Sequence, residues 1–238
     1  MTPRSPVVAA WNHVASVLSV PKPRSATARH DAPTLVLFVR HGTTPTTGAV
    51  LPGRAKGLHL AERGIQQAET VAGRIGALNK VSAVYASPLE RTRETAAPIA
   101  KATGNRVRTD RSLLECDFGD WTGAKLSDLR KRKEWSTVQQ APSRFRFPHG
   151  ESFSEMQVRI TSGVDRLVAS HPGQTIVAVS HADPIKAVAA QALGTPLDLF
   201  QRIVVSPCSV TAILYGSGAP VVLAVNSTGD DLGSLVPS

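Results

Sequence analysis

A near-continuous run of apolar residues at positions 34–40 is the strongest structural signal in the chain. Leu35 to Val39 are all apolar, with no alternation between apolar and polar positions. Such a run is typical of a strand buried on both faces, as in a parallel sheet that is covered by helices. Shorter runs predict strands at 81–86 and 175–180, and two final strands are expected near 204–215 and 221–226.

Two segments between these runs have the spacing of amphipathic helices. Apolar residues recur every three or four positions in 62–78 and again from position 153 onward. They are Ile65, Ala68, Val71, Ala72 and Ile75 in the first segment, and Phe153, Met156, Ile160, Val164 and Leu167 in the second. Each segment is therefore expected to pack one face on the sheet.

Two further signals mark helix starts. Ser87 with Glu90, and Ser152 with Glu155, have the spacing of a capping box, in which the serine and the glutamate satisfy each other's backbone N–H groups. The first of these helices is expected to run to about position 103 and to stop at Gly104. In the last predicted helix, Asp183 is expected to be the cap and the following proline to take the first helical position.

The alternation of strands and helices predicts an α/β fold, a three-layer α/β/α sandwich with a mostly parallel central sheet. One domain is expected at 32–228, with a polar, basic excursion at 119–150 that holds one helix near 125–133. Residues 1–31 are interpreted as a flexible extension, and an export signal or a start codon set too far upstream are the alternatives. Residues 229–238 are expected to form a disordered tail.

Composition narrows the class of protein. Apolar residues make up 42% of the 238 positions, and no stretch has the roughly 20 apolar residues that a membrane-spanning helix needs. Cys116 and Cys208 have neither a metal-ligand spacing nor a disulfide pattern, so both are interpreted as small buried hydrophobes in a reducing compartment. A cytoplasmic location is expected.

The net charge of +9 points to anionic partners, which include nucleic acid, membrane surfaces and phosphorylated small molecules. Part of the charge lies in the N-terminal segment and part in the run 130–133, which is interpreted as a solvated helix face. No aromatic residues are interleaved with these runs to stack on bases. A small phosphorylated metabolite is therefore the predicted partner, with no nucleic acid and no membrane.

Residues able to handle phosphate follow the predicted strands. Arg40, His41 and Gly42 end the first strand, Arg91 lies in the first turn after the second, and His181 ends the strand at 175–180. In open α/β sheets the carboxyl ends of the strands meet in one crevice. These side chains are expected to converge there.

The chemistry of these residue types suits phosphoryl transfer. Arg40 and Arg91 would neutralise phosphate oxygens in place of a metal ion, and a neutral His41 would attack phosphorus. Glu115, flanked by apolar residues, would protonate the leaving oxygen, although a surface ion pair is its alternative reading. Asp183 is interpreted as a helix cap rather than an acid. The loop histidines are interpreted as structural or exposed, and they are His59, His149 and His171.

The chain resembles the histidine phosphatase superfamily, or phosphoglycerate mutase-like family, over residues 34–226. The resemblance is carried by the segments 37–44, 60–64, 87–92, 118–123, 150–152 and 180–181. It implies a phosphoglycerate mutase-like fold without metal or cofactor, with His41 as phosphorylated nucleophile and Glu115 as proton donor. Arg40, Arg91 and His181 would form the phosphate pocket.

Substrate contacts are expected from a second set of residues, and this set contains the departures from the family pattern. Thr47 stands where many members have an asparagine, Ala182 where a glycine usually follows the histidine, and Ala61 where a threonine often caps the helix. The predicted substrate-binding residues are Gly42, Thr44, Thr47, Arg54 and Ala182. Arg144 and Arg146 are further candidates for a second anionic group.

The predicted activity is hydrolysis of phosphomonoesters of small metabolites through a phosphohistidine. A phosphoglycerate-type phosphomutase is the alternative, disfavoured because true mutases of the family carry a more elaborate excursion that keeps water from the intermediate. A non-catalytic phosphate-binding protein is a third reading. An exposed sheet edge would let two subunits pair, so a homodimer is one candidate assembly.

Overall fold

The computed structural model describes residues 32–229 and residue 232. The predicted extension at 1–31 lies outside the described residues, as does the predicted tail at 229–238 apart from positions 229 and 232. Within the described residues, no helix is both long enough and apolar enough to cross a lipid bilayer.

Six strands form a single sheet in the order β3-β2-β4-β1-β5-β6. Their bounds are β1 Thr34–Arg40, β2 Ala83–Ala86, β3 Val107–Thr109, β4 Thr175–Ser180, β5 Val210–Tyr215 and β6 Val221–Ser227. Strands β1 to β4 pair in parallel, whereas β5 and β6 are antiparallel to their neighbours. The prediction of a mostly parallel sheet is confirmed. A homodimer through an edge strand, β3 or β6, stays a prediction.

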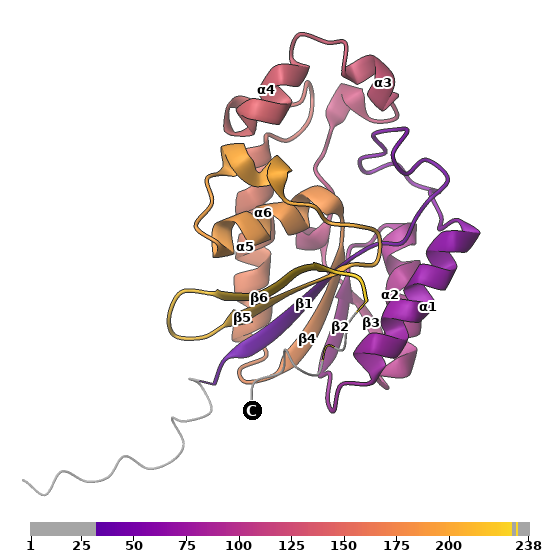
Figure 1. The fold of residues 1–238 in the computed structure, drawn as a ribbon, viewed down its shortest axis with the longest axis vertical. Coiled ribbons are helices and arrows are strands. Elements are labelled where there is room, and N and C mark those ends of the chain that lie inside the picture. Colours follow the sequence, from indigo (N-terminus) through magenta and orange to yellow (C-terminus); the bar gives the residue numbers. More distant parts are fainter. Residues whose placement is uncertain (1–31, 230–231, 233–238) are drawn as a thin grey trace, which may run out of the picture.

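Helices cover both faces of the sheet, as Figure 1 shows. Helices α1 (Glu62–Gly76) and α2 (Glu90–Ala102) lie on one face, and α5 (Phe153–Ala169) and α6 (Ala182–Ala192) lie on the other. Because side chains alternate along a strand, β1 serves both cores. Leu37 packs with residues of α1 and α2, and Phe38 with residues of α5 and α6. The predicted three-layer sandwich is confirmed.

The excursion between η1 (Arg111–Leu113) and α5 lies beyond the carboxyl ends of the parallel strands (Figure 1). It holds two short helices, α3 (Leu126–Leu129) and α4 (Trp135–Gln140), where one helix was expected. A chain of aromatic contacts, with ring centroids 4.9 to 5.4 Å apart, anchors it to α5. The rings belong to Phe118, Trp121, Phe145, Phe147 and Phe153.

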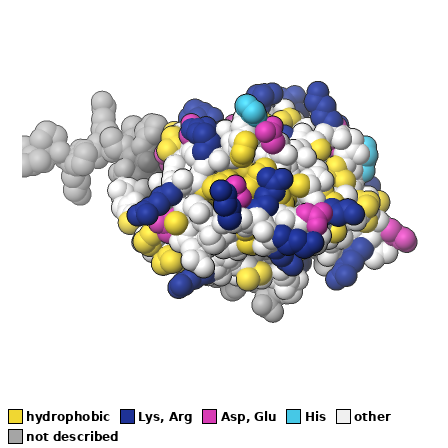
Figure 2. All heavy atoms as spheres, turned by 90° about the horizontal axis from the view of Figure 1, so that it is seen from above, with side chains coloured by type: hydrophobic (Ala, Val, Ile, Leu, Met, Phe, Trp, Pro, Cys, Tyr) yellow, Lys and Arg dark blue, Asp and Glu magenta, His cyan; other side chains and the backbone are white. Residues whose placement is uncertain are grey.

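The basic run 130–133 lies in the turn between α3 and α4 and is exposed. Its interpretation as a helix face is wrong, although its exposure to solvent is confirmed. The guanidinium of Arg132 stacks over the Trp121 ring at 5.3 Å. Figure 2 looks down on this end of the molecule and shows lysine and arginine side chains around a small apolar area.

Three local predictions at helix starts need correction. Ser87 does not cap α2, whose N-cap is Leu89 without a side-chain hydrogen bond, because the hydroxyl that would cap the helix bonds to His181 instead. Asp183 does not cap α6, since His181 is the N-cap residue and Asp183 lies inside the first turn, paired with Lys186 at 3.3 Å. Ile65 is 51% exposed rather than buried.

Two bounds also differ from prediction: the strand expected near 204–215 is only Val210–Tyr215, because residues 203–209 form a bend and a turn, and Pro184 is the third rather than the first residue of α6. Other local predictions hold. The capping box of Ser152 and Glu155 is formed at the start of α5, and α2 ends before Gly104, whose φ of +66° favours glycine. Cys116 and Cys208 are free and buried, as small hydrophobes would be. The cap position of α1 is Ala61, which has no side-chain hydrogen bond to offer.

Candidate active site

The end of β1 delivers His41 into the interior of the molecule. The loop that follows runs so close to α1 that a Cβ on Gly42 would lie 2.5 Å from the carbonyl oxygen of Gly64. The amide of Gly42 donates to the hydroxyl of Thr95 on α2 at 3.0 Å. Helices α1 and α2 therefore fix the backbone that carries His41.

His41 is buried, and its Nδ1 lies 2.8 Å from the carbonyl oxygen of Gly42. A carbonyl can only accept, so Nδ1 carries the proton and Nε2 keeps its lone pair. Burial, together with the charges of Arg91 and Arg40, lowers the pKa of His41 to about 3. The imidazole is therefore neutral, with Nε2 available as a nucleophile.

Two guanidiniums flank His41, and some of their N–H groups have no partner within the part of the chain that the structure describes. Arg91 is fully buried in the first turn of α2, while Arg40 ends β1 and donates from Nη1 to the Val205 carbonyl at 2.7 Å. The Nε of Arg40, and the Nε and Nη1 of Arg91, are buried without a hydrogen-bond partner among the described residues. Buried donors are rarely left unpaired, so these groups mark a place for an anion.

His181 lies edge-on to His41, with ring centroids 5.3 Å apart. Its Nδ1 accepts a hydrogen bond from Nη2 of Arg91 at 3.2 Å, because a guanidinium can only donate. Its Nε2 therefore carries the proton and donates to the hydroxyl of Ser87 at 2.9 Å. Nη2 of Arg91 also donates to the Gly53 carbonyl at 2.8 Å. His181 thus orients Arg91 and is itself oriented by Ser87.

Glu115 is the buried carboxyl of this region, 8% exposed. Burial raises the pKa of Glu115 to about 7, and the charge of Asp183 adds to the rise, while the Cys116 amide and the two guanidiniums oppose it. Its Oε1 accepts from the Cys116 amide at 3.0 Å. A carboxyl with a pKa near neutrality can both donate and accept a proton in that range.

Arg54 and the threonines of the loop after His41 are engaged with protein groups. Arg54 forms ion pairs with Glu151 at 2.8 Å and with Asp117 at 3.4 Å. The buried Thr44 bonds through its amide and its hydroxyl to the hydroxyl of Thr47, at 2.8 and 3.0 Å. Their roles as substrate-binding residues stay predictions.

The other predicted contacts lie in different surroundings. Ala182 is the first residue of α6, next to His181. Arg146 is exposed and pairs with Glu155 at the start of α5, and Arg144 is exposed in the excursion. Contact of Arg144 or Arg146 with a second anionic group stays a prediction.

The loop histidines have mixed surroundings. His59 is largely exposed beside Glu94, and His149 is exposed beside Asp120. His171 is buried and bonds to Tyr85 at 2.9 Å. All three are structural or exposed, as expected.

Some residues that contact this site have no sequence pattern that indicates a site role. The pattern around Ser87 predicts a helix cap, whereas the structure makes Ser87 the acceptor for His181. Arg159 and Glu151 hold the backbone of the Glu115 segment. The similarity of 150–152 to the family pattern was a signal for Glu151, but no pattern pointed to Arg159, which lies within the amphipathic helix α5.

Among residues 32–229 and 232, no group of three or more histidine, cysteine, aspartate or glutamate side chains is arranged to hold a metal ion. Next to His41, the guanidinium N–H groups of Arg40 and Arg91 could bind an anion. Chemically, the arrangement combines a neutral imidazole, two cations and a carboxyl that titrates near neutrality.

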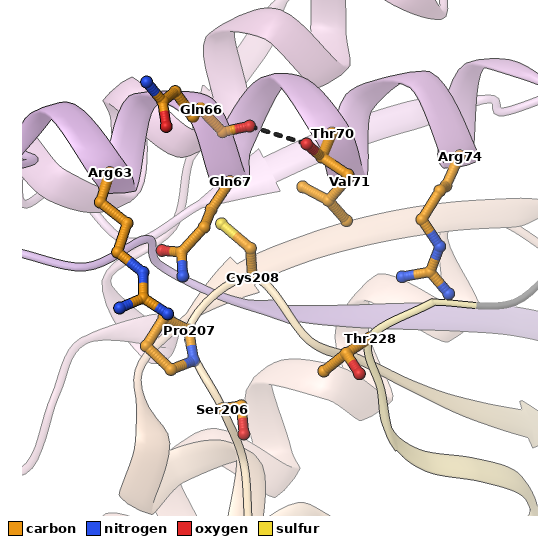
Figure 3. A pocket seen from close by; sticks show the side chains of 10 residues that line it. All are labelled: Arg63, Gln66, Gln67, Thr70, Val71, Arg74, Ser206, Pro207, Cys208 and Thr228. Carbon is orange, nitrogen blue, oxygen red and sulfur yellow. Dashed lines mark hydrogen bonds between the residues drawn. The ribbon is translucent and has the colours of Figure 1, made fainter.

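A separate cleft of about 540 Å³ lies behind the loop after β1, between α1 and residues 206–208 (Figure 3). Gln67 lines it and accepts from the Thr43 amide at 2.9 Å, while the Cys208 amide donates to the Arg40 carbonyl at 3.0 Å. Two residues that line the cleft, Gln67 and Cys208, thus hold the backbone of the site, but His41, Arg91, Glu115 and His181 do not line it.

Comparison with known proteins gives a family match over most of the chain. Residues 36–228 match the model of the histidine phosphatase superfamily (branch 1). The bifunctional protein Rv2228c of Mycobacterium tuberculosis is 31% identical over 229 residues, which are 90% of this chain and 60% of that protein. The chain thus spans about 60% of the length of this relative.

Two relatives are covered more fully. Phosphoserine phosphatase 1 of Hydrogenobacter thermophilus is 28% identical over 198 residues, 81% of this chain and 92% of that protein. The probable phosphoglycerate mutase GpmB of Erwinia tasmaniensis is 32% identical over 180 residues, 75% of this chain and 83% of that protein. The names of these relatives include both a hydrolase and a mutase.

Proposed function

Because the chain belongs to the histidine phosphatase superfamily, we propose that it hydrolyses phosphomonoesters of small metabolites through a phosphohistidine on His41. Glu115 is the proton donor in this proposal, and no metal ion takes part. The similarity to a phosphoserine phosphatase supports a small phosphorylated substrate.

The observation that carries the proposal is the set of unpaired N–H groups around His41. Arg40 and Arg91 hold three buried guanidinium nitrogens that have no partner in the described part of the chain, next to a neutral imidazole whose Nε2 carries a lone pair. A phosphoryl group would satisfy these donors with its oxygens. Its phosphorus would then lie within reach of a nucleophile of the right protonation state.

The first chemical step forms a bond between Nε2 of His41 and phosphorus and breaks the bond between phosphorus and the leaving oxygen. The protonated Glu115 gives its proton to that oxygen, which leaves as an alcohol. Nδ1–H of His41, held by the Gly42 carbonyl, keeps the ring oriented while it gains positive charge. Arg40 and Arg91 bind the charge on the transferred phosphoryl group.

The second step is hydrolysis of the phosphohistidine. Water attacks phosphorus, the Glu115 carboxylate takes one proton from it, and the electron pair of the breaking P–N bond returns to Nε2. His41 and Glu115 regain their starting states, and phosphate is released. A pKa of about 7 suits Glu115 to both roles near neutral pH.

A phosphomutase is the second candidate, favoured by the similarity to a mutase. It differs from the hydrolase only in whether the phosphohistidine passes its group to water or to a bound product. The helices of the excursion are all short: α3 and α4 have four and six residues, and two 3-10 helices, η2 (Gly119–Trp121) and η3 (Pro142–Arg144), have three each. A mutase must keep water away from the phosphohistidine, which would need a larger excursion over the site. Hydrolysis is therefore the better supported outcome.

The test is phosphate release from a panel of phosphomonoesters, with and without a chelator, by the wild type, His41→Ala and His59→Ala. The wild type and His59→Ala, which changes an exposed histidine, should keep their activity in the chelator. His41→Ala should lose roughly 10³-fold or more. Activity that disappears with the chelator, or persists in His41→Ala, would contradict the mechanism.

The same panel separates hydrolase from mutase. 3-Phosphoglycerate is added with a bisphosphoglycerate primer, and both isomerisation and phosphate release are followed. We expect release to be the faster process. Isomerisation that outruns release would favour the phosphomutase.

A further inference from the structure

Two guanidiniums converge on the backbone of Glu115. Its carbonyl oxygen accepts from Nε of Arg54 at 2.9 Å and from Nη2 of Arg159 at 3.2 Å. Nη1 of Arg159 also donates to the carbonyls of Ser112 and Leu114, at 2.7 and 2.9 Å. One side chain of α5 therefore binds three carbonyls of the segment that presents Glu115.

Glu151 joins the two guanidiniums. Its carboxylate accepts hydrogen bonds from Nε and Nη2 of Arg159 at 2.8 and 3.0 Å, and it forms an ion pair with Arg54, whose Nη2 lies 2.8 Å away. The amide of Asp117 donates to it at 3.0 Å. These side chains are 19 to 27% exposed, so solvent screens them only in part. Arg159 is thus held as a planar fork in one orientation.

The segment that these groups hold has no regular structure of its own. Residues 114–118 lie between η1 and η2 (Gly119–Trp121) without helix or strand. The place of Glu115 therefore depends on side-chain bonds rather than on a strand ladder. Arg159 supplies more of these bonds than any other described side chain: it donates three hydrogen bonds to backbone carbonyls, and two more bonds to Glu151 hold its guanidinium in place.

We propose that Arg159, held by Glu151, is a positioning residue that sets the place of the Glu115 carboxyl relative to the leaving oxygen. It touches neither substrate nor reacting atoms, and it acts through the backbone of Glu115. The proposal rests on the role of Glu115 as proton donor in the proposed function.

A pair of substrates separates this role from a general structural one. Glycerol phosphate has a strongly basic leaving oxygen that needs a proton as the bond to phosphorus breaks, whereas p-nitrophenolate leaves without one. A misplaced acid therefore slows attack on the first ester much more than on the second. A variant that disturbs the phosphate pocket slows both equally.

The decisive variant is Arg159→Lys, which keeps the charge but loses the planar fork. We expect kcat/KM for glycerol phosphate to fall by about 100-fold, and for p-nitrophenyl phosphate by only a few-fold. KM should change little, because the guanidiniums of the phosphate pocket are intact. Arg166→Lys, two turns further along α5 and largely exposed, should match the wild type on both esters.

Glu151→Gln provides a second variant should Arg159→Lys fail to fold, as judged by its thermal unfolding. It removes the charge that holds both guanidiniums, and the same preference for the aryl ester is expected. Equal losses on the two esters, or no loss on either, would overturn the proposal. Glu115→Gln is measured beside it: if that variant shows no preference for the aryl ester, the proposed acid itself is wrong, and the failure lies in the proposed function.

Discussion

Two helix starts in this molecule carry the same sequence signature and are built differently. At α5, Ser152 accepts from the Glu155 amide at 3.1 Å, and Glu155 accepts from the Ser152 amide at 2.9 Å. At α2, the corresponding serine is Ser87, whose amide donates to the Val179 carbonyl at 3.0 Å and whose hydroxyl accepts from His181. One serine stabilises its helix, and the other serves the site.

The difference shows where local rules give way to function. An N-cap hydrogen bond contributes about 1 kcal/mol to stability, and α2 forgoes it. Instead, the hydroxyl of Ser87 accepts from Nε2 of His181 and orients its ring, and Nδ1 of His181 in turn orients Arg91. Substitutions at the start of α2 should therefore affect activity more than stability, and substitutions at the start of α5 should do the reverse.

The largest effect is expected from Arg91→Lys at the start of α2. Lysine cannot supply the planar donors that bind phosphate oxygens and His181, so kcat/KM should fall by roughly 10³-fold. The midpoint of thermal unfolding should not fall by more than a few degrees, because the buried guanidinium has unpaired N–H groups that oppose folding. Arg93→Lys, at an exposed position on the same helix, is the matched control. An active Arg91→Lys enzyme would refute the proposed phosphate pocket.

The next effect is the dependence of activity on pH, for which the glutamates of the two regions should behave differently. A hydrogen bond from Arg146, together with the cap, lowers the pKa of Glu155 to about 2, whereas burial raises the pKa of Glu115 to about 7. A raised pKa means that Glu115 is protonated below pH 7 and loses its proton above it. For alkyl phosphates, kcat/KM should therefore fall by about tenfold per pH unit above 7. Glu155 stays ionised in this range, so the capping box should be unaffected.

This pH dependence is checked with kinetics and circular dichroism measured on the same samples from pH 5 to 9. The loss should come without loss of helix, and Glu115→Gln, which cannot titrate, should lack it. A fall in activity that persists unchanged in Glu115→Gln would assign the titration to another group. Since the pKa of His41 is about 3, no loss through protonation of His41 is expected in this range.

A smaller effect is expected from Ser87→Ala. The buried Nε2–H of His181 loses its acceptor, and an unsatisfied buried donor costs about 1 to 3 kcal/mol. We expect the ring of His181, and with it Arg91, to be less well oriented, so that kcat/KM drops by about 10-fold while thermal stability changes little. A variant with full activity and a lower unfolding midpoint would mean that Ser87 is a cap after all, and that the two helix starts do not differ.

The fold could be predicted well because its signals are local. The apolar run at 34–40 is β1, and the predicted bounds 175–180 are those of β4, since a strand buried on both faces needs an unbroken run of apolar residues. Ile65 shows the limit of such signals. Its spacing places it with Ala68 on the apolar face, yet it lies in the first turn of α1 and is 51% exposed.

The site could be predicted in part. Strand ends are local features, so His41, Arg91 and His181 were expected to converge, and hydrogen bonds and ring contacts now join them. Its supporting contacts could not be predicted, because they join distant positions. Ser87 and His181 are 94 residues apart, and Arg159 and Glu115 are 44 apart. Neither serine nor arginine has a local pattern that reveals such a partner.

The smallest effect is expected at the start of α5, with Ser152→Ala. The variant loses the side-chain cap and should lose about 1 kcal/mol of unfolding free energy, which lowers the thermal midpoint by roughly 2–4 °C in a domain of this size. Ser152→Asp keeps a capping oxygen and should retain most of the stability. Activity of both variants at 25 °C should equal that of the wild type, because the first turn of α5 precedes Arg159 by more than one turn. An activity loss in Ser152→Ala without a change in the midpoint would show that this start, too, serves the site, and the contrast with α2 would fail.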